Sequence, residues 1–302
     1  MFVWQAHKGS VRAVAFSPDG TRLVTATGSS RSVSLWNPIT GELARKLDLG
    51  IRDSVAQSVA FAPDAPLLAV GMSGSVRVWD TVNWNEIAIL TPREKGGSDG
   101  FFEVAFGRGS NPLLAAGAKN RVCVWDDAGR VQATGTRYPD TEFAIGNVPC
   151  LDFSPDSSLL ATNGLAKAKL WESTTGKKVR EIPHTHSSHP GPIKFSPDGT
   201  HLVVGYRKLV SIYPITEPDG EPVTCTGHTQ LVWSACWSAD GRALLTASKD
   251  GTARLWEPSS GTELKTFEWG IGEIRTAAFS ADGLLGAAAG NDGKVVVWDV
   301  DA

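Results

Sequence analysis

The chain has 302 residues, 29 of them basic and 32 acidic, and its formal net charge is −3. Because the two signs nearly cancel, no strong field is available to attract nucleic acid or an anionic membrane, and we expect neither as a partner. No apolar stretch approaches the ~20 residues of a membrane span, and residues 1–10 lack the zones of a signal peptide, so we expect a cytoplasmic protein.

From the N-terminus, the chain starts with a short apolar segment, Phe2–Gln5, which is followed by Ala6 and His7. A second segment, Val223–Thr226, stands in the same way before Gly227 and His228. We therefore predict that Phe2–Gln5 is a β-strand of the same kind as Val223–Thr226.

A short motif resembling FSPDG then recurs along the whole chain. It begins at the aromatic residues Phe16, Phe61, Phe106, Phe153, Phe195, Trp237 and Phe279. A second aromatic follows each of these after 18 to 20 residues, at Trp36, Trp79, Trp125, Trp171, Tyr213, Trp256 and Trp298. A period of 42 to 47 residues, sustained from end to end, indicates an array of stacked supersecondary units.

The sixth repeat shows the predicted elements most clearly. Apolar runs at 231–237, 242–248, 252–256 and 262–268 are separated by the turn sequences SADG, KDG and EPSSG. Short runs rich in Val, Leu, Ala and Trp, bounded by Gly, Pro, Asp and Ser, are typical of antiparallel hairpins. No helical periodicity of useful length is present, so we predict an all-β chain with four strands in each repeat.

The repeat spacing, the SPDG-like turns and the Trp-Asp pairs at Trp79, Trp125 and Trp298 resemble the WD40-repeat family over essentially the whole chain. The resemblance implies a seven-bladed β-propeller of four-stranded antiparallel blades, and we expect residues 1–302 to form one such domain. Pairing of Phe2–Gln5 with the strand at Lys294–Trp298 would complete the last blade, close the ring and remove exposed sheet edges.

The resemblance also implies a buried hydrogen-bond tetrad in well-formed blades, running from a His through a Ser or Thr and an Asp to the repeat Trp. Blade six alone has a complete match, with His228, Ser248, Asp250 and Trp256. Blade one keeps His7 and Trp36, with Thr27 as a candidate hydroxyl and no Asp, and blades two to five lack the acid. A His–Asp pair can also belong to a catalytic triad, but these positions favour the structural role.

Three histidines, His184, His186 and His189, lie close together between repeats four and five and could bind zinc or nickel. His186, however, precedes Phe195 by nine residues, as His228 precedes Trp237, so we assign it to the structural His position. Cysteines at positions 123, 150, 225 and 236 lie in apolar runs without CxxC spacing, which favours buried, reduced thiols. We therefore expect no metal site and no cofactor.

Four residues before each first aromatic, at the entrance to the innermost strand, the repeats place Arg12, Gln57, Phe102, Pro149, Gly191, Trp233 and Arg275. We expect these residues to form a ring around the mouth of the central channel. Arg12 and Arg275 belong at a wet surface, because an unpaired buried charge costs several kcal/mol.

Paired carboxylates, a GxSxG elbow and a calcium loop are all missing from the sequence, so an enzymatic function has no residues to carry it. We expect a noncatalytic, monomeric scaffold that docks protein or peptide partners on the channel-mouth face, as the resemblance implies. The alternative is a ligand-binding or hydrolytic propeller with a site at the channel mouth, since propellers host both functions.

The predicted partner-binding residues are Arg12, Phe102, Trp233, Trp269 and Arg275. Trp and Arg most often dominate interface energetics, and an acidic or aromatic-containing peptide would fit them best. The competing interpretation is that Phe102 and Trp233 pack in the core, that Trp269 packs under its own loop, and that the arginines pair with Glu273 and nearby acids.

Overall fold

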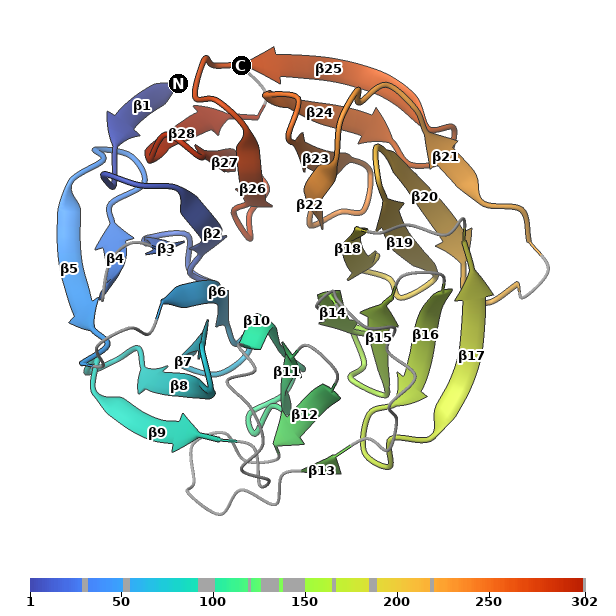
Figure 1. Cartoon of the computed structure of the whole chain (residues 1–302), viewed down its shortest axis with the longest axis horizontal. Helices are drawn as coiled ribbons and strands as arrows, with labels where there is room; N and C mark the ends of the chain where they lie inside the picture. Colours follow the sequence, from blue (N-terminus) through green and yellow to red (C-terminus); the bar gives the residue numbers. More distant parts are fainter. Residues whose placement is uncertain are drawn as a thin grey trace.

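The computed structural model is a closed ring of seven β-sheets around a central opening (Figure 1). It describes residues 1–28, 32–50, 55–91, 101–118, 121–125, 136–137, 150–164, 167–184, 189–217 and 220–300, and only the backbone of residues 101, 102, 121, 136 and 137. Within these residues every regular element is a β-strand, and each sheet has four antiparallel strands. The predicted fold, an all-β propeller with seven blades, is confirmed.

Each of blades one to six is built from four consecutive strands. Blades one to three contain β2 (Val11–Phe16), β3 (Leu23–Thr27), β4 (Ser32–Trp36) and β5 (Leu43–Asp48); β6 (Ala56–Phe61), β7 (Leu67–Met72), β8 (Ser75–Asp80) and β9 (Glu86–Leu90); and β10 (Phe101–Phe106), β11 (Leu114–Ala118), β12 (Arg121–Trp125) and β13 (Thr136–Arg137). Blades four to six contain β14 (Cys150–Phe153), β15 (Leu159–Asn163), β16 (Lys167–Glu172) and β17 (Lys178–Pro183); β18 (Pro190–Phe195), β19 (His201–Tyr206), β20 (Leu209–Pro214) and β21 (Val223–Cys225); and β22 (Val232–Trp237), β23 (Leu244–Ser248), β24 (Thr252–Glu257) and β25 (Thr262–Glu268).

Blade seven joins the two ends of the described chain. Its strands β26 (Ile274–Phe279), β27 (Leu285–Gly290) and β28 (Lys294–Asp299) are completed by β1 (Phe2–Gln5), which pairs with β28 from Phe2 opposite Val297 to Gln5 opposite Lys294. The amides of Ala6 and His7 both donate to the carbonyl of Gly293 at 3.0 Å. The predicted closure of the ring by the N-terminal strand is confirmed.

The SPDG-like turns fix the end of each inner strand opposite the mouth. In the first, the Ser17 hydroxyl donates to Asp19 at 2.5 Å, and Asp19 accepts the Thr21 amide at 3.0 Å. Gly20 has a φ of 68°, a left-handed conformation that glycine adopts without steric cost. Asp198 makes the same contacts with Ser196 and Thr200 in blade five, so the repeated sequence produces a repeated turn.

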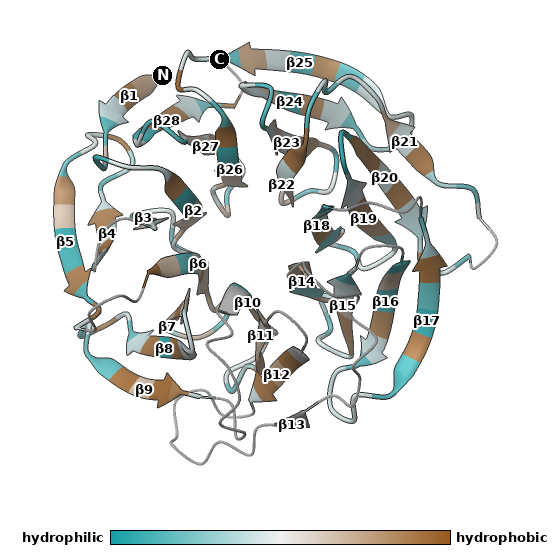
Figure 2. Cartoon of the chain, in the orientation of Figure 1, coloured by the Kyte–Doolittle hydropathy of each residue, from teal (hydrophilic) through white to brown (hydrophobic). Residues whose placement is uncertain are grey.

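The hydrophobic core is divided among the interfaces between blades. Seven clusters of buried apolar side chains are found in the described residues, and each joins two neighbouring blades. Inner and middle strands supply most of these residues, whereas outer strands such as β17 carry hydrophilic stretches (Figure 2). No helix in the described part of the chain could span a membrane. Face-to-face packing of the sheets therefore holds the seven inner strands around the channel.

Candidate functional site

The inner strands enclose a channel whose mouth carries three of the predicted binding residues. A cavity of ≈ 570 Å³ is lined by Arg12 from β2, Trp233 from β22 and Arg275 from β26, together with Gln57 from β6. These side chains come from blades one, two, six and seven, which are neighbours in the closed ring. The repeat position that we assigned to the mouth thus brings two cations and an indole to one cavity.

Arg275 and Trp233 form a stacked pair. The guanidinium carbon of Arg275 lies 4.7 Å from the centre of the Trp233 ring, which is within the range of a cation–π interaction. Arg275 Nη2 also donates to Glu273 at 3.0 Å, and Lys249 lies 3.8 Å from the other carboxylate oxygen of Glu273. Arg12 donates to the side-chain oxygen of Gln57. Glu273 is therefore shared, while Arg12 has no carboxylate partner among the described residues.

The mouth contains more hydrogen-bond donors than acceptors among the described residues. Burial lowers the pKa of the Arg12 guanidinium, and the positive charge of Arg275 lowers it further. Trp233 Nε1 and Arg275 Nε are buried and have no hydrogen-bond partner among the described residues. Buried donors of this kind are normally paired, so a group that supplies negative charge and acceptor oxygens would be favoured here.

Two other predicted binding residues are placed differently. Trp269 stacks on Phe267 with ring centres 5.2 Å apart and contacts Trp298 at 4.6 Å, as part of the core between blades six and seven. This packing favours the competing interpretation for Trp269, which is partly buried, and its part in binding stays a prediction. Phe102 belongs to β10 at the mouth, but its side chain lies outside the described residues.

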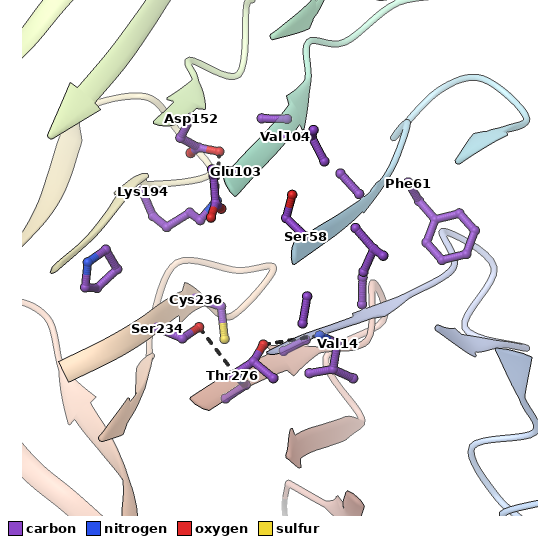
Figure 3. A pocket seen from close by; sticks show the side chains of 18 of the residues that line it. Val14, Ser58, Phe61, Glu103, Val104, Asp152, Lys194, Ser234, Cys236 and Thr276 are labelled. Carbon is purple, nitrogen blue, oxygen red and sulfur yellow. Dashed lines mark hydrogen bonds and ion pairs between the residues drawn. The ribbon is translucent and has the colours of Figure 1, made fainter. Parts of the chain in front are cut away.

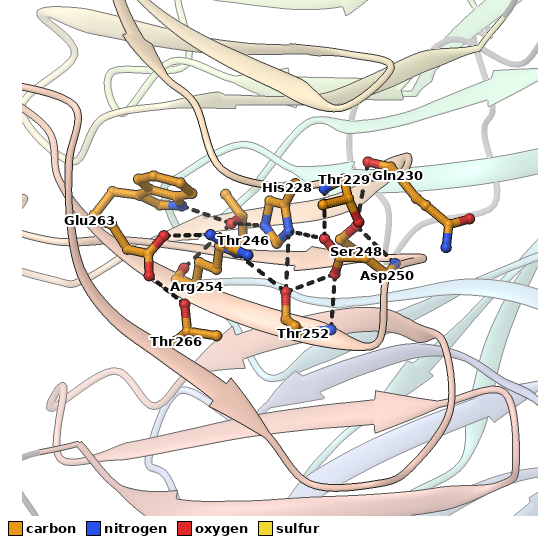
Figure 4. Close-up of polar contacts among 11 residues, drawn as sticks. His228, Thr229, Gln230, Thr246, Ser248, Asp250, Thr252, Arg254, Glu263 and Thr266 are labelled. Atoms are coloured by element: carbon orange, nitrogen blue, oxygen red, sulfur yellow. Dashed lines mark hydrogen bonds and ion pairs between the residues drawn. The ribbon is translucent and has the colours of Figure 1, made fainter.

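A polar network joins the loop before blade six to its strands (Figure 4). His228 Nδ1 contacts Asp250 at 2.9 Å, and His228 Nε2 contacts the Thr246 hydroxyl at 2.8 Å. Trp256 Nε1 donates to the same hydroxyl at 2.8 Å. Thr246 lies two residues before Ser248 on β23, so the two side chains point to the same side of the sheet. The Thr246 hydroxyl is therefore the link between His228 and Trp256.

The role assigned to Ser248 in this tetrad is therefore corrected. The Ser248 hydroxyl accepts the Asp250 amide at 3.1 Å and donates to the Gln230 carbonyl at 3.4 Å, which makes it part of the turn. Blade one follows the same rule: Thr25, and not Thr27, contacts His7 at 2.7 Å and accepts from Trp36 at 2.8 Å. In both blades the linking hydroxyl lies two residues earlier than expected.

Burial and hydrogen bonding act in opposite directions on the ionisable members of these networks. Burial lowers the pKa of His228, although its contact with Asp250 acts the other way. Burial disfavours the ionised Asp250, but hydrogen bonds from Thr252, Thr229 and His228 outweigh it and lower the pKa to about 2. The pair is thus a neutral imidazole held by a carboxylate near neutral pH, and it is enclosed by its own blade.

Below the mouth, the channel carries a charged cluster that we did not predict. Lys194 Nζ from β18 lies 3.3 Å from Asp152 Oδ1 on β14 and 3.9 Å from Glu103 Oε1 on β10, and all three side chains point into the cavity (Figure 3). The second oxygen of Asp152 accepts the Phe195 amide at 2.9 Å. A sequence signal exists, because the three residues stand one or three positions before a repeat aromatic, where side chains face the channel.

The cluster has more negative than positive charge when its groups are ionised. Burial raises the pKa of Glu103 and of Asp152, although Lys194 acts against both shifts. Burial disfavours charge on Lys194, but Asp152 and Glu103 outweigh it and raise its pKa. The nearby Cys150 thiol has its pKa raised to about 12, first by burial and then by the charge of Glu103. One ammonium therefore does not fully compensate two carboxylates.

Of the three clustered histidines, His186 lies outside the described residues. His184 Nε2 contacts the side-chain oxygen of the buried Asn163 at 3.0 Å, and its ring stacks on Tyr206 at 5.5 Å. The amide nitrogen of Asn163 donates to the carbonyls of Gly191 and Gly205, so this network joins blades four and five. The part of the chain that the structure describes holds no group of three His, Cys, Asp or Glu side chains suited to a metal ion.

Comparison with known proteins gives the same family as the fold. The profile of the WD domain, G-beta repeat, matches residues 1–37, 50–80, 220–257 and 261–299. Serine-threonine kinase receptor-associated protein of Gallus gallus is 35% identical over 99 residues, 32% of this chain and 27% of that protein. Telomerase protein component 1 of Rattus norvegicus is 28% identical over 286 residues, 91% of this chain and 10% of that protein.

Echinoderm microtubule-associated protein-like 3 of Mus musculus is 21% identical over 263 residues, which are 86% of this chain and 28% of that protein. The chain thus spans less than a third of the length of each of these relatives. The repeat spacing, the seven sheets in a ring and the matched profile together show that this chain belongs to the WD40-repeat family.

Proposed function

We propose that residues 1–302 act as one noncatalytic docking domain that holds a protein or peptide segment on the channel-mouth face. The observation that carries this proposal is the cavity at which Arg12, Trp233 and Arg275 converge. Arg and Trp at the centre of a surface are the side chains that most often dominate binding energy. Serine-threonine kinase receptor-associated protein, a relative, is named for association with another protein, which fits a docking role.

The partner is expected to offer an acidic group. Arg12 and Arg275 lie on the neighbouring strands β2 and β26; Glu273 is shared by Arg275 and Lys249, Arg12 has no carboxylate partner among the described residues, and two buried donors also lack partners there. A carboxylate can accept from both guanidiniums, and charge-assisted hydrogen bonds of this kind are the stronger ones. An aromatic or aliphatic neighbour on the same segment could pack against the exposed part of Trp233.

The composition supports the rest of the proposal. The nearly balanced charge favours a protein partner over nucleic acid or a membrane, and we propose that the domain works as a monomer in the cytoplasm. The alternative, a hydrolytic or small-ligand site at the mouth, would need acidic or His side chains converging there. The described mouth positions instead carry two arginines, a tryptophan and a glutamine, and the acid beside them, Glu273, is already paired with Arg275 and Lys249, which favours docking.

Affinity capture from the source cell, followed by measurement of binding to the captured partner, tests the proposal. Trp233→Ala and Arg275→Ala should each weaken binding by ~1 kcal/mol or more. Arg242→Ala is the matched control, because Arg242 is 88% exposed on the turn after β22, at the end of that strand opposite Trp233. If both mouth variants bind as tightly as the original while changes in the His184–His189 loop abolish binding, the surface is on the wrong blades.

A further inference from the structure

The cavity at the mouth continues into the channel, and its two parts have opposite polarity. At the mouth the charged groups are Arg12, Arg275 and the shared Glu273, with Lys249 beside it. Deeper in the same cavity Glu103 and Asp152 lie around Lys194, and Arg108, which also lines the cavity, is paired with Asp64 at 3.6 Å. Glu103 directly follows the mouth position at residue 102, and Asp152 and Lys194 stand three residues beyond the mouth positions 149 and 191.

Within the channel cluster, Glu103 is the less well compensated carboxylate. Its distance to Lys194 Nζ is 3.9 Å, against 3.3 Å for Asp152, and Asp152 also accepts a backbone amide at 2.9 Å. The side chain of Glu103 is 32% exposed to the channel, so it can be reached by a group that enters the cavity. When Glu103 and Asp152 are both ionised, a second cation would bring the charge of the cluster to zero, which a partly buried site favours.

The rest of the cavity wall carries small side chains. From blades one, two, six and seven these are Ala13, Ala15, Ser58, Ala60, Ser234, Thr276 and Ala278. Ser58, which also lines the cavity, has a buried hydroxyl without a hydrogen-bond partner among the described residues (Figure 3). A long side chain with a cationic end can reach the cluster from the mouth while its apolar stem packs on these small side chains.

We propose that the channel is a second subsite and that it receives a lysine or arginine side chain of the docked segment, while an acidic side chain of that segment pairs with the arginines at the mouth. This inference rests on the proposed function, because the docked segment carries the basic side chain into the channel. A free cation is less suited, since it leaves the arginines without their acceptor and must pass their positive charge. The ligand is thus a short peptide that bears one group of each sign.

A randomised library of acetylated and amidated octapeptides, selected against the full chain, tests this proposal without a known partner. The intact protein should enrich peptides with Asp or Glu and with Lys or Arg at a fixed spacing. The Glu103→Gln variant should still enrich peptides that contain Asp or Glu, but it should no longer select for Lys or Arg. Glu42→Gln, which removes an exposed charge in the turn between β4 and β5, should behave like the original chain.

Calorimetry on one selected peptide makes the test quantitative. Glu103→Gln should lower the affinity for that peptide on the order of tenfold. The peptide with norleucine in place of its basic residue should bind the original chain and the Glu103→Gln variant with equal affinity. Melting curves of both variants establish that they are folded. The channel subsite is overturned, and the docking mouth left intact, if the enriched peptides are acidic without a preference for a basic residue. The same conclusion follows if Glu103→Gln lowers the affinity for the selected peptide and for its norleucine analogue equally. Enrichment of no peptide would overturn the docking mouth as well.

Discussion

Replacing Thr246 by valine removes one hydroxyl from the centre of the blade-six network and keeps the shape of the side chain. That hydroxyl contacts His228 Nε2 and Trp256 Nε1, both at 2.8 Å. His228 is 4% exposed and Trp256 is 1% exposed, so water cannot replace the lost contacts. An unsatisfied buried polar group costs about 1–3 kcal/mol, and two such groups predict a loss of about 2–6 kcal/mol in unfolding free energy.

Ser248→Ala is the matched comparison, because Ser248 lies on the same strand but makes contacts of 3.1 and 3.4 Å within the turn. We expect it to cost only about 1 kcal/mol. Urea denaturation followed by tryptophan fluorescence measures the unfolding free energy of both variants. The melting temperature of Thr246→Val should be lower than that of the original chain by on the order of 5 °C. The assignment is refuted if Ser248→Ala destabilises the protein as much as Thr246→Val, or if Thr246→Val is neutral.

Three further predictions follow from the fold. Deletion of Met1–Gln5 removes the strand that pairs with β28 and should lower the melting temperature by on the order of 10 °C in a calorimetric scan; unchanged melting would rule out the closure. Burial, and then the charge of Lys46, lower the pKa of His7 from 6.5 to about 4, so the unfolded chain binds this proton more readily. The stability that neutral His7 contributes is therefore complete above pH 6.5 and is lost as pH falls toward 4, and urea titrations of the original chain and His7→Gln should converge over that range. Trp269→Ala should lower stability by roughly 2 kcal/mol through lost packing on Phe267 and Trp298 while partner affinity stays unchanged; weaker binding by the folded variant would place Trp269 on the docking surface.

The repeat pattern was sufficient to predict the architecture because it fixes strand, turn and strand order together. The Ser17 and Asp19 side chains, for example, build the same turn as Ser196 and Asp198, so equal spacing in sequence becomes equal geometry in space. The pairing of Phe2–Gln5 with the strand at Lys294–Trp298 could also be predicted, because the last blade lacked an outer strand and this segment preceded the first repeat.

The site was predicted less completely, for reasons that lie in strand geometry. The linking hydroxyl was assigned two residues too late at both Ser248 and Thr27, because side chains two apart point to the same side of a strand and sequence spacing alone cannot separate them. Trp269 lies in a loop, and its packing on Trp298 depends on a fold of that loop that no period specifies. The residues of the cluster at Lys194 come from three different blades, so their repeat positions predict that they face the channel, whereas their contacts with one another depend on how the inner strands are placed.

Site-specific photo-crosslinking tests the central claim, that partners dock at the mouth of the channel, most directly. A benzoylphenylalanine at position 8, an exposed residue just before β2, reports on the mouth face, and one at position 242 reports on the turn at the opposite end of the inner strands. We predict that the captured partner is crosslinked from position 8 and not from position 242. Crosslinking from position 242 and not from position 8 would contradict the account.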